Sequence, residues 1–565
     1  MGIKQLLSST WRIAVFFVIP LAILPFPLVV NTQLAGATYV LMINIIFYIL
    51  MPIPLAINAM LPVFLYPLLG VHPAGQIATW FMNDPTTLLI SSMAFALGIE
   101  AVNLHERIAL KVLTVLGPRP ERLLLAFLIV SGFLSMWISN IAAVVMLLPI
   151  VRAVNKDLCE QENNITGNDA VSINSKAVNE EFAEDPPAST KVQKFTMGLV
   201  LSIIYGASIG GMSTLIGAHP NIVFKLVMDQ IYGDVTGVNF ATHMMICTPL
   251  GIVSLLIVWL LMTIMYVPDY IKSCCKKQER TPEEMRAQDK LHKNLKGQYE
   301  KLGSIRFEEG SVIFFFLFLL MLWFFRSPSV FPGWEIAFKK GYVSDNAPTL
   351  LLVATLFVWP RSLKALWTTG KHDPILTWPI MQRRFPWEIF LFACGTNVLS
   401  EGSTRGGIAE WTAEQMNALS GIPPWAMMIL ISLVTAILTE FIGNSTLVTL
   451  LLPILATFAT QSLVNPIYYL LPAALCTMLS FMTPVAAPIT ALVYGEKLVT
   501  RREMCVTGLI PKITCFILVI LFVNTFGDLV YNVHHFPQWA NLSAANNASS
   551  VHRVRVLNLF LNEPI

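Results

Sequence analysis

The segment SMWISNIAAVVMLLPI, residues 135–150, decides the fold of this chain, because a similar segment returns 304 residues later as TEFIGNSTLVTLLLPI, residues 439–454. In both segments an asparagine, Asn140 or Asn444, is followed nine residues later by Pro-Ile. The apolar stretch between the asparagine and the proline is too short to cross a bilayer. The repeat therefore predicts two matching elements that enter a membrane without crossing it.

Each of these segments is followed by a second interrupted element. The first is SIGGMSTLIGAHPN at 208–221, and the second is SFMTPVAAPIT at 480–490. Glycine and proline at this density break a helix. Inside a membrane, a broken backbone survives only where protein buries it or a water-filled space adjoins it. Paired interrupted segments in the two halves of a membrane protein indicate the binding site of a secondary transporter.

A broken helix leaves backbone groups unpaired at both sides of the break, and these groups can bind ions. The N–H end carries partial positive charge and suits an anion. The C=O end, together with Ser, Thr and Asn oxygens, suits Na⁺. None of the four segments contains Lys or Arg, which fits weak and reversible anion binding. The alternative is that the four segments are re-entrant turns used only for helix packing, because small and hydroxyl residues also pack membrane helices.

The composition also points to a membrane. Of 565 residues, 55% are hydrophobic and only 13% are charged, whereas an average soluble chain has about 25% charged residues. The apolar content excludes a disordered chain, and 8 Cys exclude a disulfide-rich secreted fold. A net charge of +3 does not indicate nucleic-acid binding. We therefore expect an all-α polytopic membrane protein.

Between 11 and 13 apolar windows, with boundaries uncertain by a few residues, recur along the chain. Two polar connections separate them, at 152–194 and at 272–306. The second holds ten Lys or Arg residues, so the positive-inside rule places it in the cytoplasm, and we expect a solvated connector there. Glycosylation sequons at Asn541 and Asn547 predict that the C-terminal tail, 532–565, is extracellular.

These features make the chain resemble the divalent anion/sodium symporters, a family of sodium-coupled dicarboxylate, citrate and sulfate carriers and INDY-type citrate carriers. The resemblance runs from about residue 40 to Ala540. Its strongest stretches are GIEAVNLHERIAL at 98–110, LSMWISN at 134–140, ASIGG at 207–211 and FPQWA at 536–540. The resemblance implies a homodimer with about 11 transmembrane helices in two inverted repeats, two re-entrant hairpins, and a transport part that moves like an elevator past a scaffold.

The resemblance also implies a division of the chain. It assigns N-terminal scaffold helices to 1–84. The first repeat, with hairpin 1 (about 123–150) and a cytoplasmic loop at 152–194, takes 85–245. Further scaffold helices and the basic cytoplasmic loop take 246–345, and the second repeat with hairpin 2 (about 424–455) takes 346–531.

Carried over residue by residue, the resemblance implies the ligands of the transported species. The substrate would meet Asn140, Asn444, Ser445, Ala218 and Pro488. One sodium site would use Ser139, Asn140 and backbone near Gly217. The other would use backbone at Gly443 and Ala486, with Asn444. Sodium would be the coupling ion, and no further cofactor is expected.

The chain departs from the family pattern at both hairpin tips. Ile141 stands where the family has Thr, Gly443 stands where it has Ser, and Ser445 stands where Thr is usual. A lost oxygen leaves fewer of the hard ligands that sodium needs. Sodium-independent INDY-like citrate transport, sulfate transport, and anion sensing without transport therefore remain alternatives.

Three ionisable residues lie in apolar surroundings or beside the anion site. His219 either favours a more highly charged anion at low pH or is a neutral ring bonded to backbone. Glu100 and Glu440 are expected to be paired, and Glu440 is placed to orient the second hairpin, since it lies four residues before Asn444.

A membrane enzyme would need Asp, His or Cys residues that converge on an active site, and the apolar spans contain no such pattern. We therefore expect a secondary transporter of small di- and tricarboxylates such as succinate and citrate. We expect it in the plasma membrane, with a cytoplasmic N-terminus and an extracellular C-terminus.

Overall fold

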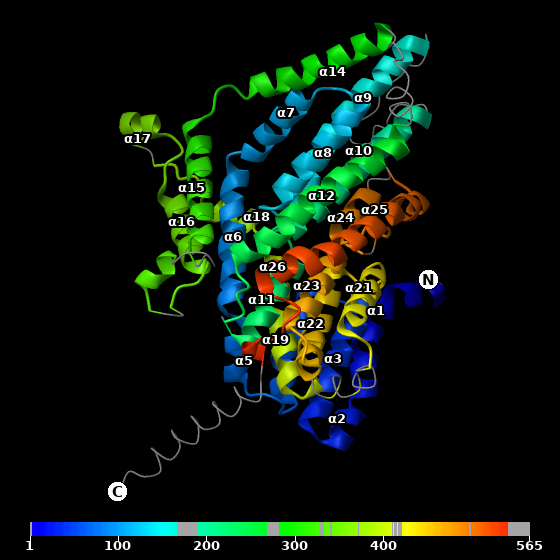
Figure 1. Cartoon of the computed structure of the whole chain (residues 1–565), viewed down its shortest axis with the longest axis vertical. Helices are drawn as coiled ribbons and strands as arrows, with labels where there is room; N and C mark the ends of the chain where they lie inside the picture. Colours follow the sequence, from blue (N-terminus) through cyan, green and yellow to red (C-terminus); the bar gives the residue numbers. More distant parts are fainter. Residues whose placement is uncertain are drawn as a thin grey trace.

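The computed structural model of the chain is built from helices (Figure 1). It describes residues 3–166, 190–233, 235–267, 282–326, 333–339, 342–370, 372–408, 411, 415, 421–484, 486–495 and 499–540. Within these ranges no strand forms, and the one β-type contact is an isolated bridge between Pro360 and Pro374. The predicted all-α fold is confirmed. The predicted glycosylation sites Asn541 and Asn547 lie outside the described residues.

The two halves of the chain contain matching helices in the same order. The first half has α6 (Asp84–Ala101), α8 (Pro120–Ser135) and α9 (Asn140–Thr166). Their counterparts are α19 (Trp387–Arg405), α21 (Pro424–Leu438) and α22 (Asn444–Gln461). Each counterpart begins 303 or 304 residues later, so the repeat of the two asparagine segments extends to whole helices.

A broken helix follows each hairpin. In the first half, α10 (Thr190–Met212) and α11 (His219–Tyr232) flank a first break at 213–218. In the second half, α23 (Pro466–Thr477) and α24 (Pro488–Gly495) flank a second break at 478–487. A long helix then closes each half, α12 (Phe240–Tyr266) or α25 (Arg501–Phe522). Both breaks lie where glycine and proline interrupt the apolar sequence, as predicted.

The halves interlock through the remaining helices. The N-terminal helices are α1 (Ile3–Ile23), α2 (Pro25–Val30), α3 (Gln33–Leu50), α4 (Leu55–Leu68) and α5 (Ala74–Phe81). The α4 helix precedes α6 but packs against α19 of the second half. Conversely, α16 (Asn346–Val358) precedes α19 but packs against α6 of the first half. Each half thus supplies a helix that completes the packing of the other.

The apolar core has one large cluster and two smaller ones. The largest joins both hairpins, both broken helices, α12 and α25. A second cluster is formed mainly by α6, α16 and α15 (Phe307–Phe324), and a third by α3, α4 and α19. The α12 helix, whose residues from 246 onward were expected in the scaffold, packs against α8 and α10 in the largest cluster.

The described helices fit a multi-pass membrane protein. Six are long and apolar enough to cross a bilayer, or seven if the bent pair Ala74–Ala101 and Leu104–Leu116 forms one span. Five shorter apolar helices accompany them: Gln33–Tyr48, Ala56–Leu68, Asn346–Val358, Pro424–Leu438 and Pro466–Thr477.

The polar connections are more helical than the sequence suggested. The α9 helix continues to Thr166, into the first connection. In the second connection, residues 282–301 form α14 (Pro282–Lys301) against α7 (Leu104–Leu116) and α9 (Figure 1), and its described Lys, Asp and Glu side chains are exposed, as expected of a solvated connector. Leu295 buries its side chain in the largest core cluster, and this long-range contact fixes a segment whose charges suggest solvation.

The chain is completed by several short elements. These are η2 (Trp334–Ala337), α17 (Leu363–Thr369), α18 (Trp378–Arg384), η4 (Val523–Gly527), α26 (Asp528–Tyr531) and η5 (Gln538–Ala540).

Candidate functional site

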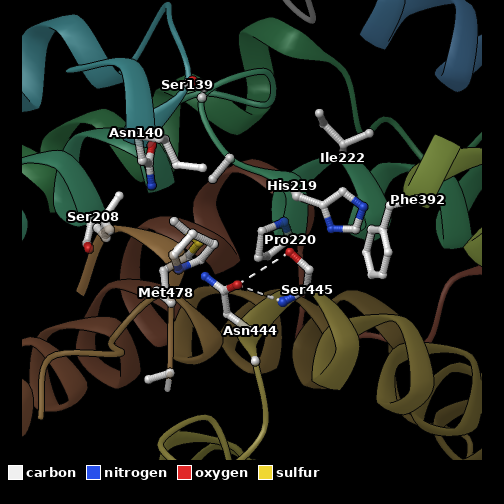
Figure 2. Close-up of a pocket in the computed structure, with 18 of the residues that line it drawn as sticks. Ser139, Asn140, Ser208, His219, Pro220, Ile222, Phe392, Asn444, Ser445 and Met478 are labelled. Carbon is white, nitrogen blue, oxygen red and sulfur yellow. Dashed lines mark hydrogen bonds between the residues drawn. The ribbon is translucent and has the colours of Figure 1, made fainter. Parts of the chain in front are cut away.

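The tips of the two hairpins face each other across a cavity of about 730 Å³. Figure 2 shows Ser139 and Asn140 on one side of this cavity and Asn444 and Ser445 on the other. The structure brings all the predicted site residues to its wall: Ser139, Asn140, Gly217, Ala218, Gly443, Asn444, Ser445, Ala486 and Pro488. Their roles in binding stay predictions.

At the first tip, polar contacts hold both predicted residues in place. The Ser139 hydroxyl oxygen accepts a hydrogen bond from the Ala142 N–H at 3.2 Å and so caps the start of α9. The Ser135 hydroxyl bonds to the Asn140 side-chain oxygen. The Asn140 amide nitrogen is the donor of this side chain and therefore the group that could bind an anion. Gly211 permits this packing, since a Cβ there would lie 2.6 Å from the Asn140 oxygen.

The second tip is arranged differently. Gly443 stands at the cap position of α22 and offers no side-chain bond. The Asn444 side-chain oxygen accepts from the Ser445 N–H at 2.7 Å and from the Ser445 hydroxyl at 3.3 Å (Figure 2). The Asn444 backbone N–H donates to the Ala486 carbonyl oxygen at 3.2 Å, which ties this tip directly to the second break.

The first break is held by neutral side chains, two of them on its own broken helix. Thr214 donates its hydroxyl to the Met136 carbonyl at 2.6 Å and accepts from the Gly217 N–H at 3.0 Å. The Asn221 amide nitrogen donates to the carbonyl oxygens of Gly211 at 3.0 Å and Thr214 at 2.7 Å. Backbone groups freed by the break are thereby satisfied locally.

The second break is held by a charged side chain from hairpin 2. The Glu440 carboxylate accepts the backbone N–H groups of Phe481 at 3.1 Å, Met482 at 3.2 Å and Thr483 at 2.9 Å. The Lys512 ammonium donates to the same carboxylate at 2.6 Å. The expected pairing of Glu440 is confirmed, and its contact with the second break is a further finding.

Few charged side chains line the cavity. Among the described lining residues these are Glu388 and Arg501, which are both exposed, and the Arg501 guanidinium lies 5.2 Å from the centre of the Tyr494 ring. Glu100, outside the cavity, meets Arg384 at 3.4 Å, which confirms the expected pairing.

Of the two alternatives for His219, the ring bonded to backbone is wrong, and the effect on the anion at low pH stays a prediction. Both ring nitrogens are buried without a hydrogen-bond partner among the described residues. The ring packs against Phe392 of α19, at 5.2 Å between ring centres (Figure 2). His219 therefore lies where α11 meets a neighbouring helix, at the edge of the cavity.

The site combines groups that suit an anion with groups that suit a hard cation. Amide nitrogens and the starts of α9 and α22 present partial positive charge, while hydroxyl and carbonyl oxygens can coordinate sodium. Within the described ranges, no group of three or more His, Cys, Asp or Glu could hold a metal ion.

Several residues of the site escaped the sequence analysis. Thr214, Thr483 and Lys512 give no signal in sequence, because these partners lie 43 to 78 residues away along the chain. Arg501 could have been found from its place just before an apolar span, since two arginines at a helix start oppose the helix dipole.

Comparison with known proteins agrees with this geometry. The model of the family described as sodium:sulfate symporter transmembrane region matches residues 5–533. The rat Na(+)/citrate cotransporter is 33% identical, over 96% of this chain and 99% of its own length. Human solute carrier family 13 member 4 is 30% identical over the same shares, and rat Na(+)/dicarboxylate cotransporter 3 is 30% identical over 96% of this chain and 97% of its own. The chain belongs to the sodium:sulfate symporter family, whose members are membrane transporters and not enzymes.

Proposed function

We propose that this chain is a secondary transporter of small di- and tricarboxylates such as succinate and citrate. The observation that carries the proposal is the cavity between the two hairpin tips, with Asn140 on one wall and Asn444 and Ser445 on the other. Donors on opposite walls suit a ligand with a carboxylate at each end. The names of the rat citrate and dicarboxylate cotransporters support the same substrate class.

The lining favours a carboxylate over sulfate. Between the polar tips the wall is made of apolar side chains, among them Ile141, Met478 and Ala487. Such a wall can contact the carbon skeleton of a dicarboxylate, whereas sulfate has no apolar part. Sulfate transport remains the second candidate within the family because of the description of its matching model.

Sodium coupling is proposed at the first tip. Ser139 supplies a hydroxyl oxygen there, next to Asn140 and the backbone of Gly217. At the second tip Gly443 brings no side chain to the predicted sodium site, and the Ser445 hydroxyl donates to the Asn444 side-chain oxygen. A hard cation binds more weakly where oxygens are missing, so we expect the first site to dominate the sodium dependence.

The decisive experiment is uptake of labelled succinate, citrate and sulfate into cells that display the protein at their surface, in sodium and in choline. We expect sodium-dependent uptake of succinate and citrate, and its loss in Asn140→Ala and Asn444→Ala. Equal uptake in both salts would replace the proposal by a sodium-independent carrier. Uptake of sulfate alone would replace the substrate, and anion binding without uptake would indicate a sensor.

We also propose that the protein is a homodimer in the plasma membrane, with a cytoplasmic N-terminus and an extracellular C-terminus. The basic connection at 272–306 and the sequons at Asn541 and Asn547 support this orientation. Removal of glycans by a glycosidase should shift the wild-type protein on a gel and leave the Asn541→Gln/Asn547→Gln variant unshifted.

A further inference from the structure

The transport site described above does not use the Glu440–Lys512 ion pair. Neither residue lines the cavity, and the side chains of Glu440 and Lys512 are 7% and 8% exposed. Glu440 belongs to the turn of hairpin 2, and Lys512 belongs to α25. Burying two charges costs more than most pairs return, and an ionisable residue at membrane depth is a candidate for function.

The pair fastens hairpin 2 to the second break. Three backbone N–H groups of 481–483 bond to the Glu440 carboxylate, and the Thr483 hydroxyl donates to the Glu440 carbonyl at 2.6 Å. Thr439 donates its hydroxyl to the Thr477 carbonyl at 2.9 Å, at the end of α23. The turn of the hairpin thus satisfies freed backbone groups on both sides of the break.

The corresponding positions in the first half are apolar. Met136 lies 304 residues before Glu440, and its carbonyl accepts the Thr214 hydroxyl as the Glu440 carbonyl accepts the Thr483 hydroxyl, both at 2.6 Å. The residue of the first half that corresponds to Lys512 can be found from two glycines, one on α12 and one on α25, that lie close to the two breaks. A Cβ on Gly251 of α12 would meet Ser213 of the first break, and a Cβ on Gly508 of α25 would meet Phe481 of the second.

Leu255 stands four residues after Gly251, as Lys512 stands four residues after Gly508. The backbone pattern is therefore shared by both halves, but the charge pair is confined to the second.

The same half lacks a hydroxyl at its tip. Ser139 caps α9 and offers an oxygen to a cation, whereas Gly443 offers none. A bound cation between a hairpin tip and a broken helix would hold the two together by bonding oxygens of both. In the second half, the ammonium group of Lys512 and the carboxylate of Glu440 already supply such a link.

We propose that Lys512 and Glu440 are positioning residues that hold hairpin 2 on the second break without a bound sodium ion. Sodium is then required only to order the first tip. This inference rests on the proposed function, because it assigns the sodium requirement of the same transport site to one of its two halves.

The test measures how well ordered each hairpin tip is, by the accessibility of a cysteine placed there, and does not depend on transport. One variant carries Gly443→Cys, where the glycine faces open space, and a second carries Ile141→Cys at the first tip. Both are made in a background in which the half-buried Cys505, together with Cys159, Cys274 and Cys275, whose side chains lie outside the described part of the structure, is replaced by serine. The rate of maleimide labelling is measured in sodium and in choline. We expect sodium to slow labelling at position 141 and to leave the rate at position 443 unchanged.

The charge pair is then altered. Lys512→Gln removes the positive charge, and Lys512→Arg is the matched control that keeps it. With Lys512→Gln, labelling at position 443 should become sodium-dependent by about tenfold, equivalent to about 1.4 kcal/mol, and with Lys512→Arg it should stay sodium-independent. A labelling rate at position 443 that is slowed by sodium in the wild-type background would overturn the proposal, as would an unchanged rate in Lys512→Gln.

If Lys512→Gln does not fold, the double change Glu440→Met/Lys512→Leu gives the second half the residues of the first and leaves no unpaired charge. The same sodium dependence at position 443 is expected there, and its absence overturns the inference. Uptake by the wild type, measured in parallel, tests the proposed function itself. A chain without uptake of any tested anion refutes that function, while the labelling rates still decide the role of the pair.

Discussion

The two broken helices of this protein solve one physical problem in two ways. At the first break, Thr214 and Asn221 of the broken helix itself bond to the freed backbone groups. At the second, Glu440 reaches across from hairpin 2 and is neutralised by Lys512 of α25. Unsatisfied backbone groups cost several kcal/mol each in a membrane, so both breaks need partners. The difference teaches that neutral side chains, among them Thr214 and Asn221, hold the first break, whereas a charged side chain of hairpin 2 binds three backbone N–H groups of the second.

The largest expected effect removes the partner of the second break. Glu440→Ala leaves three N–H groups and the Lys512 ammonium without the carboxylate, and breaking a buried pair in this way costs about 3–5 kcal/mol. We expect a strongly lowered melting temperature of the purified protein. The control is Glu300→Ala, whose partner Lys296 is 62% exposed and for which the expected change is about 0–1 kcal/mol.

Glu440→Gln separates charge from shape. The amide keeps one acceptor oxygen for the N–H groups but cannot neutralise Lys512. If Glu440→Gln loses as much stability as Glu440→Ala, the effect comes from the charge. If it loses almost none, the negative charge is not what holds the second break, and the contrast with the neutral first break fails.

The second expected effect lies in the first half, at the contact between α10 and hairpin 1. In Gly211→Ala the new Cβ would lie 2.6 Å from the Asn140 oxygen, so that Asn140 must shift. Overpacking of this kind costs about 1–3 kcal/mol. We expect a raised KM for succinate, because Asn140 is a proposed ligand, together with a moderate loss of stability. Gly443→Ala, where the Cβ would meet nothing within 4 Å, should leave the stability almost unchanged.

Sequence alone predicted the positions of the hairpin tips and of both breaks, because Asn-flanked turns and dense Gly and Pro act locally on the backbone. The repeat indicated a binding site, and the resemblance to the symporter family implied that the two tips meet there. Every substrate or sodium ligand that the resemblance implied lines the cavity.

The groups that hold the breaks could not be predicted in this way. Lys512 pairs with Glu440, which lies 72 positions away, and the sequence around either residue does not indicate the other as its partner. The helix α14 was missed for a similar reason, because α7 and α9, against which it packs, lie far away along the chain, and Leu295 joins a core cluster formed by distant helices. The orientation of the His219 ring toward Phe392 likewise depends on how α11 meets α19.

The third expected effect compares the caps of α9 and α22. Ser139→Ala removes the oxygen that accepts the Ala142 N–H, and loss of such a cap costs about 1 kcal/mol. We expect the half-saturating sodium concentration for uptake to rise as well, because the same oxygen is a proposed cation ligand. Ser139→Thr keeps the oxygen and serves as the control. A sodium dependence unchanged in Ser139→Ala would remove Ser139 from the cation site.

The smallest expected effect comes from adding a serine hydroxyl to the second tip, at the position that corresponds to Ser139 of the first. Gly443→Ser fits without strain, since the glycine has φ −51° and a Cβ would meet nothing within 4 Å. As a helix cap, serine exceeds glycine by only a few tenths of a kcal/mol, so the melting temperature should barely rise. The added hydroxyl nevertheless supplies an oxygen beside Asn444 and Ala486. If Lys512 and Glu440 already hold this tip, the sodium dependence of uptake should stay that of the wild type, and a steeper dependence would show that the second half lacks only this oxygen to bind the ion.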